Sequence, residues 1–105
     1  MTTWFISRHP GAREWVRRQG IAIDRYLDHL HPEQISPGDR VMGSLPVNLA
    51  AEVCRRGARY LHLSVDIPPN YRGRELTIEE LERFGARLEA FSVRRESPDP
   101  SEKPE

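Results

Sequence analysis

The chain has 105 residues, equal numbers of acidic and basic side chains and one cysteine. This length suits one domain and leaves no room for a second. No apolar run approaches about 18 residues and the start carries no basic segment, so we expect neither a membrane span nor a signal peptide. Cys54 has no partner for an internal disulfide, which favours the reducing cytoplasm.

Arginine supplies 15 of the 16 basic side chains. A coding bias explains this as well as a functional need does, because guanidinium groups bind phosphates in a bidentate manner. Residues 1–60 hold nine arginines against six acidic side chains, and the remainder balances this excess. The zero net charge therefore excludes a broad duplex-binding surface but not a local anion-binding pocket.

The first half of the chain alternates short apolar segments with amphipathic ones. Residues 4–6 are uniformly apolar, as in a strand buried on both faces of a parallel sheet. Pro10 suits the first turn of a helix that Gly20 ends. We predict further elements in this order: a strand over 21–27, a helical turn over 31–35 and a strand over 40–45.

The second half continues the alternation. Apolar side chains at helical spacing predict a buried helix that Gly57 ends: Val47, Ala50, Ala51 and Cys54. A strand follows over 60–65, and a capping box from Thr77 to Glu80 opens a helix that reaches about Phe84. The last strand covers 88–93, and the polar, proline-containing residues 94–105 are predicted to form a disordered tail.

Strands that alternate with helices predict an α/β domain over residues 1–93. We expect a mostly parallel five-stranded sheet, about three flanking helices and right-handed crossovers. Ligands in such sheets bind beyond the carboxyl ends of the strands. The loops after the first, third and fourth strands are therefore the expected site.

The first of these loops contains Ser7, Arg8 and His9, followed by Gly11 in the helix. Free amides at a helix start favour a phosphate oxygen, and Arg8 would neutralise its charge. His9 would move a proton near neutral pH, and Ser7 would hydrogen-bond a phosphate or hydroxyl. The alternative is that Ser7 and His9 only cap the helix.

The second loop contains Gly43, Ser44 and Asn48. Gly43 permits a ligand or a neighbouring backbone to approach closely, and Asn48 is suited to a base edge or a ribose hydroxyl. The alternative is a capping role for Ser44 or Asn48. The spacing is not that of a P-loop, because the Lys-Ser/Thr pair is missing.

The third loop, residues 66–75, is long and charged, and it is predicted to fold over the same edge of the sheet as a lid. Asp66, Arg72 and Arg74 are its candidate ligand-binding residues, and a plain solvated loop is the alternative. His29 and His31 have no surrounding ligand set with metal spacing. We therefore expect no metal and no cofactor.

Two long runs, residues 4–12 and 43–54, resemble a small CRISPR-associated accessory family of type III systems, and residues 62–66 and 72–76 fit the same pattern. The resemblance covers about residues 4–93. It implies a Rossmann-like fold akin to the CRISPR-associated Rossmann-like (CARF) domains. It also implies a ring nuclease that degrades the cyclic oligoadenylate messenger and ends the antiviral response.

This implication agrees with the chemistry of the first loop. A two-fold homodimer would present its loops twice around cyclic tetra-adenylate. Attack by a ribose 2′-hydroxyl on its own 3′-phosphate needs alignment and charge stabilisation but no metal. Two alternatives remain open: a module that only sequesters the messenger, and a phosphatase of the Arg-His type, in which Pro10 would replace the usual glycine.

Overall fold

The computed structural model describes residues 1–96. The predicted tail of residues 94–105 therefore lies, from residue 97 on, outside the described residues. Residues 94–96 belong to no helix or strand. Along the described chain, strands and helices alternate as the sequence predicts, and no helix there is long and apolar enough to cross a membrane.

Five strands form one sheet in the order β2-β1-β3-β4-β5. The first four are parallel, and β5 pairs with β4 in the antiparallel direction. The strands are β1 (Thr3–Ile6), β2 (Arg25–Leu27), β3 (Arg40–Gly43), β4 (Arg59–Ser64) and β5 (Arg87–Phe91). The prediction of a mostly parallel five-stranded α/β sheet is confirmed.

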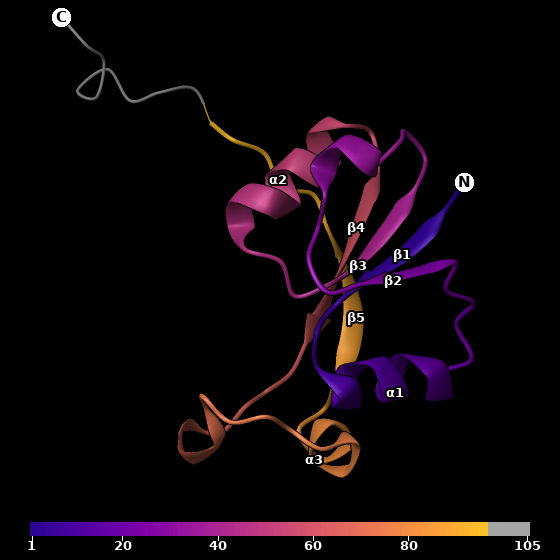
Figure 1. Ribbon diagram of the computed structural model, residues 1–105. Helices are drawn as coiled ribbons and strands as arrows, with labels where there is room; N and C mark the ends of the chain where they lie inside the picture. Colours follow the sequence, from indigo (N-terminus) through magenta and orange to yellow (C-terminus); the bar gives the residue numbers. More distant parts are fainter. Residues whose placement is uncertain (97–105) are drawn as a thin grey trace, which may run out of the picture.

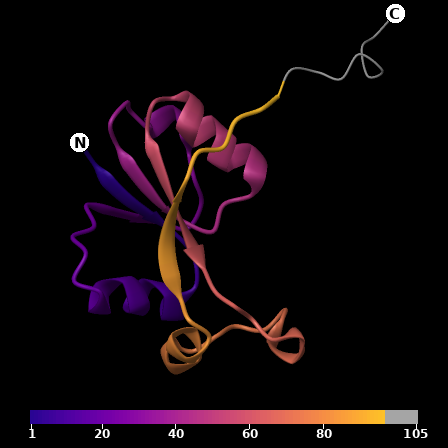
Figure 2. The ribbon, with the colours of Figure 1, turned by 180° about the vertical axis from the view of Figure 1, so that it is seen from behind.

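Three α-helices cover the two faces of the sheet: α1 (Pro10–Arg18), α2 (Val47–Arg55) and α3 (Ile78–Arg83). Helix α2 lies on one face, and α1 and α3 lie together on the other, as the front and rear views show (Figures 1 and 2). Two single-turn 3₁₀ helices, η1 (Pro32–Gln34) and η2 (Pro69–Tyr71), lie in the connections.

Each face of the sheet carries its own hydrophobic core because successive strand side chains point to opposite sides. Trp4 and Ile6 pack with Val53 on the α2 side. Phe5, between them in sequence, packs with Trp15 on the α1 and α3 side. All five are buried, which accounts for the uniformly apolar first strand.

Three predicted boundaries differ by two or more residues, and one predicted buried position is wrong. Strand β5 ends at Phe91 rather than at residue 93. Strand β2 begins at Arg25 rather than at residue 21, because the Asp24 backbone and carboxylate both hydrogen-bond the backbone of Thr3 just before the ladder. Strand β3 ends at Gly43 rather than at residue 45. The Leu45 N–H donates to the Tyr60 hydroxyl instead of to the backbone of a neighbouring strand. Val47 opens α2 with 73% of its surface exposed.

The strand order reverses direction at β1. The connection from β1 leads outward to β2, whereas β3 lies on the other side of β1. The loops that leave the carboxyl ends of β1 and β3 therefore diverge, and such a point in an open α/β sheet leaves a crevice. The topology places the predicted loops around it.

Candidate functional site

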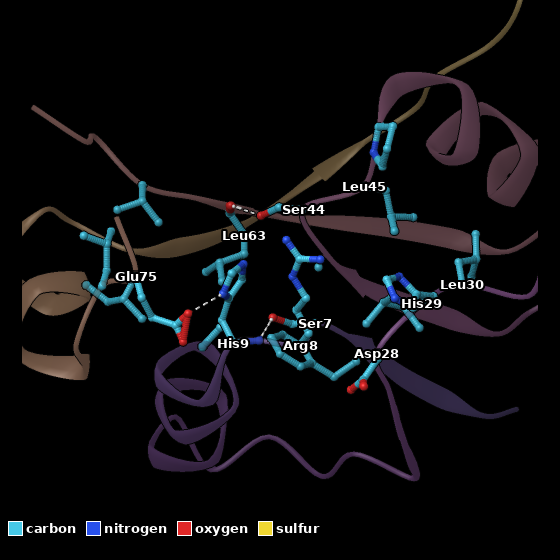
Figure 3. Close-up of a pocket in the computed structure, with 18 of the residues that line it drawn as sticks. Ser7, Arg8, His9, Asp28, His29, Leu30, Ser44, Leu45, Leu63 and Glu75 are labelled. Carbon is cyan, nitrogen blue, oxygen red and sulfur yellow. Dashed lines mark hydrogen bonds and ion pairs between the residues drawn. The ribbon is translucent and has the colours of Figure 1, made fainter. Parts of the chain in front are cut away.

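A cavity of about 580 Å³ lies at the carboxyl edge of the sheet (Figure 3). The loops after β1, β2, β3 and β4 all contribute to it. Six of the predicted site residues line it: Ser7, Arg8, His9, Gly43, Ser44 and Arg74. The topology thus gathers side chains from three separate parts of the sequence around one space.

The turn between β1 and α1 presents Arg8 and His9 to the cavity (Figure 3). The Ser7 hydroxyl accepts a hydrogen bond from the His9 backbone at 3.1 Å, which holds the turn. His9 Nδ1 lies 3.2 Å from Glu75 Oε1 on the third loop. Arg8 is exposed, and none of the ion pairs among residues 1–96 includes it.

Helix α1 begins at this turn. His9 is its N-cap, and within residues 1–96 no side chain caps it, so the capping alternative does not describe this helix start. Its first turn contains no acidic residue. The positive end of the helix dipole favours an anion beside Arg8.

Arg13, on α1, joins the loops after β1 and β2. Its Nε donates to the Ser7 carbonyl at 2.8 Å, and its guanidinium also pairs with the Asp28 carboxylate. The Ser7 N–H donates to the Leu27 carbonyl at 2.9 Å, directly before Asp28. These bonds fix the two loops relative to each other.

Gly43 and Ser44 close the cavity wall at the end of β3. Gly43 has a φ of 151°, and a Cβ placed on it would lie 2.4 Å from the Ile6 carbonyl oxygen. The close approach that the sequence indicated is therefore to a neighbouring backbone. The Ser44 hydroxyl donates to the Leu63 carbonyl at 2.9 Å, which joins the ends of β3 and β4.

Burial raises the pKa of the Tyr60 hydroxyl, although the hydrogen bond that it accepts from Leu45 N–H at 2.9 Å opposes this rise. Its oxygen also lies 3.1 Å from the Gly43 carbonyl and 2.6 Å from His62 Nδ1. The Tyr60 hydroxyl thus holds the turn after β3 by hydrogen bonds to the backbone of Gly43 and Leu45. His62 is held away from the cavity as a half-buried structural residue.

Four predicted site residues lie outside the cavity lining. A Cβ on Gly11 would approach the Leu76 carbonyl to 2.5 Å, so Gly11 lets the third loop pack on α1. Asp66 forms an ion pair with Arg87 at 3.3 Å, and Arg72 is exposed at the end of η2. Asn48 faces a separate groove between α2 and residues 92–95.

The third loop reaches the cavity through Ile67 near its start and through Arg74 and Glu75 at its end, with Leu76 directly after them. The Arg74 guanidinium lies over the Tyr71 ring at 4.6 Å and near Glu80 at 3.9 Å. The end of the loop is thus tied to the body of the domain and also forms one cavity wall. Residues 68–73, between these two ends, do not line the cavity.

Sequence reasoning missed the loop after β2. Asp28, His29 and Leu30 all line the cavity, although the sequence analysis considered His29 only as a metal ligand. The carboxyl end of this strand was the available signal, because the predicted strand over 21–27 ends at the same residue as β2. The apolar part of the wall comes from Leu45, Leu49, Leu63, Val65 and Ile67.

The described residues offer no cluster of side chains that could bind a metal ion. Within the described part of the chain, no three His, Cys, Asp or Glu side chains gather closely enough to hold an ion. The two carboxylates of the lining, Asp28 and Glu75, pair with Arg13 and His9, whereas the Arg8 guanidinium beside the helix start has no ion-pair partner within residues 1–96. This guanidinium suits an anionic ligand.

Residues 4–94 match the profile of a family described as "Putative CRISPR-associated protein (Cas_VVA1548)". The chain belongs to this CRISPR-associated family. The match covers all the cavity-lining residues and, apart from Thr3 at the start of β1, every described strand and helix. Neither the curated proteins nor the solved structures contain a significant match.

Proposed function

We propose that this CRISPR-associated protein is a ring nuclease that binds and cleaves cyclic oligoadenylate, with cyclic tetra-adenylate as the preferred ring. The observation that carries the proposal is Arg8. Its exposed guanidinium lines the cavity at the start of α1 and forms no ion pair within residues 1–96.

A phosphodiester is the substrate class that this arrangement favours. Charge on the phosphorane oxygens grows during cleavage, and Arg8 at the start of α1 would stabilise it. His9, beside Arg8, supplies an imidazole that can accept or donate a proton. No step requires a metal, because the 2′-hydroxyl of the ribose is itself the nucleophile and the product is a 2′,3′-cyclic phosphate.

The apolar part of the cavity supports a nucleotide rather than free phosphate. Leu45 and Leu49 on one side and Ile67 on another offer surfaces for a purine ring. A volume of about 580 Å³ lies within the usual range of small-molecule sites. One protomer would therefore hold one part of the ring. We also propose that the fold is Rossmann-like and related to the CARF domains.

A homodimer would complete the site. A cyclic tetra-adenylate has approximate symmetry, and two protomers related by a two-fold axis would present two cavities to it. Val47, with 73% of its surface exposed, directly follows the cavity-lining Pro46 and offers apolar contact area near the cavity. Light scattering of the protein with and without the ring tests this part, and a monomer under both conditions contradicts it.

The decisive experiment incubates the protein with labelled cyclic tetra-adenylate in the presence of EDTA and separates the products. Linear fragments that end in a 2′,3′-cyclic phosphate are expected. Tight retention of the intact ring would instead identify a sequestering module. Activity that requires added magnesium or manganese would contradict the mechanism, and phosphate release from simple phosphomonoesters would support the phosphatase alternative.

A further inference from the structure

Two of the four histidines in the chain reach the cavity. His9 and His29 line it, and they come from different loops. His62 is bound to the Tyr60 hydroxyl at 2.6 Å, and His31 is the N-cap of η1 outside the cavity lining. The proposed mechanism uses His9 and leaves His29 without a role.

His29 is exposed two residues after the end of β2. Among the hydrogen bonds and ion pairs of residues 1–96, none involves its imidazole, whereas the neighbouring Asp28 is engaged by Arg13. Figure 3 shows the imidazoles of His9 and His29 on either side of Arg8. A ligand phosphate at Arg8 would therefore share the cavity with imidazoles from two different loops.

The relative position of these loops is set by the fold. Arg13 bonds to the Ser7 carbonyl and to Asp28, and the Ser7 N–H bonds to the Leu27 carbonyl. His29 follows this bonded segment directly, so its backbone is anchored beside the turn that carries Arg8 and His9. Such preorganisation is what proton transfer in an active site requires.

We propose that His29 is the general acid of the cleavage and His9 the general base. The inference rests on the proposed function. Glu75 lies against Nδ1 of His9 and leaves Nε2 free to accept a proton. His9 takes the proton of the ribose 2′-hydroxyl as O2′ bonds to phosphorus. The bond from phosphorus to the 5′-oxygen breaks, and His29 gives that oxygen its proton.

The geometry of the reaction explains why two groups are needed. In an in-line displacement, the attacking and leaving oxygens lie on opposite sides of the phosphorus. One side chain cannot serve both within a single step. Imidazoles from two different loops of one cavity suit this requirement, with the Arg8 guanidinium left for the non-bridging oxygens.

The first test compares His29→Ala with His31→Ala, a matched variant two residues along the same connection. His29→Ala should slow single-turnover cleavage of cyclic tetra-adenylate by about 10²–10⁴-fold, with binding and thermal melting close to those of the parent. His31→Ala should match the parent in all three. Parent-like cleavage by His29→Ala would overturn the inference. His29→Gln, which keeps a polar side chain but cannot transfer a proton, should repeat the loss.

The second test replaces the 5′-bridging oxygen at each scissile bond of the ring with sulfur. A thiolate leaves without protonation, so His29→Ala should cleave this substrate within about threefold of the parent, whereas His9→Ala stays slow. Equal slowing of both variants on both substrates would overturn the assignment of His29 as the acid. A parent protein that cleaves neither substrate would instead refute the proposed function itself.

Discussion

Polar side chains at the two edges of the sheet differ in burial and in hydrogen bonding. At the amino edge, Asp39 is buried with 4% of its surface exposed, and three donors satisfy it. Thr2 N–H, Ser36 N–H and the Trp4 indole donate to its carboxylate at 2.9, 3.0 and 3.1 Å. These bonds lower the pKa of Asp39, although burial alone would raise it.

At the carboxyl edge, Arg8 and His29 are exposed in a cavity, and neither forms an ion pair within residues 1–96. A buried, fully bonded polar group stabilises one conformation, and its removal costs folding free energy. Exposed groups that line a cavity contribute little to stability and remain available to a ligand. The contrast predicts that substitutions at the two edges affect different measurements.

Gly43 offers the largest expected effect, because it lies in the cavity wall but belongs to the fold. Gly43→Ala places a Cβ against the Ile6 carbonyl oxygen at a backbone angle that alanine rarely adopts. We expect a loss of about 3–5 kcal/mol in the free energy of unfolding. Urea denaturation measures it. A variant that is as stable as the parent but no longer binds the ligand would show that Gly43 serves ligand binding rather than the fold.

Asp39→Ala should lower the free energy of unfolding by about 2–4 kcal/mol, because it leaves buried donors without an acceptor. Thermal melting and denaturant titration measure the loss. Cleavage per folded molecule should equal that of the parent when it is measured below the melting temperature. A selective loss of cleavage would show that the two edges of the sheet are coupled.

The Asp39 carboxylate should also affect how the free energy of unfolding depends on pH in the acid range. The folded-state pKa of Asp39 is lowered, so its contribution is complete above the unfolded value of about 3.9 and disappears as the pH falls through the folded value. The parent should therefore lose more stability than Asp39→Ala between pH 6 and pH 2. Parallel profiles for the two proteins would contradict this assignment.

Arg8→Ala should reduce single-turnover cleavage by about tenfold to a hundredfold, or roughly 1.4–2.7 kcal/mol in activation free energy. Arg8→Lys should recover only part, because an ammonium lacks the planar fork. The melting temperature should not change. Arg59→Ala is the matched control, since Arg59 is an exposed arginine that begins β4 at the opposite edge. Equal activity of both alanine variants would remove Arg8 from the site.

Glu75→Gln gives the smallest expected effect. Its contact with His9 is exposed on both sides, so stability should change by less than about 1 kcal/mol. Cleavage should fall by about threefold to tenfold because His9 loses an orienting contact. The difference from the parent should shrink at high salt, where exposed charges are screened. A difference that does not depend on salt would show that Glu75 acts otherwise than as a charge.

Local sequence signals predicted most of the fold. The uniformly apolar residues 4–6, the capping box at Thr77 and the alternation of strands with helices each depend on neighbours along the chain. The structure confirms the strand, the capping box and the sheet type. The same logic predicted the turn after β1 and the end of β3 as parts of one site, because parallel strands end at a common edge.

Tertiary packing decided which side chains reach the cavity. Gly11 and Gly43 look alike in sequence as flexible positions, but each contacts another backbone, and Asp66 and Asn48 face other partners or another groove. His29 enters the cavity only because β2 pairs with β1 and Arg13 joins their loops. Such contacts connect residues distant in sequence, and no local pattern of residue types encodes them. The amino-acid sequence thus determined three of the four loops that surround the site, and the packing of the sheet added the loop after β2 and determined which side chains face the cavity.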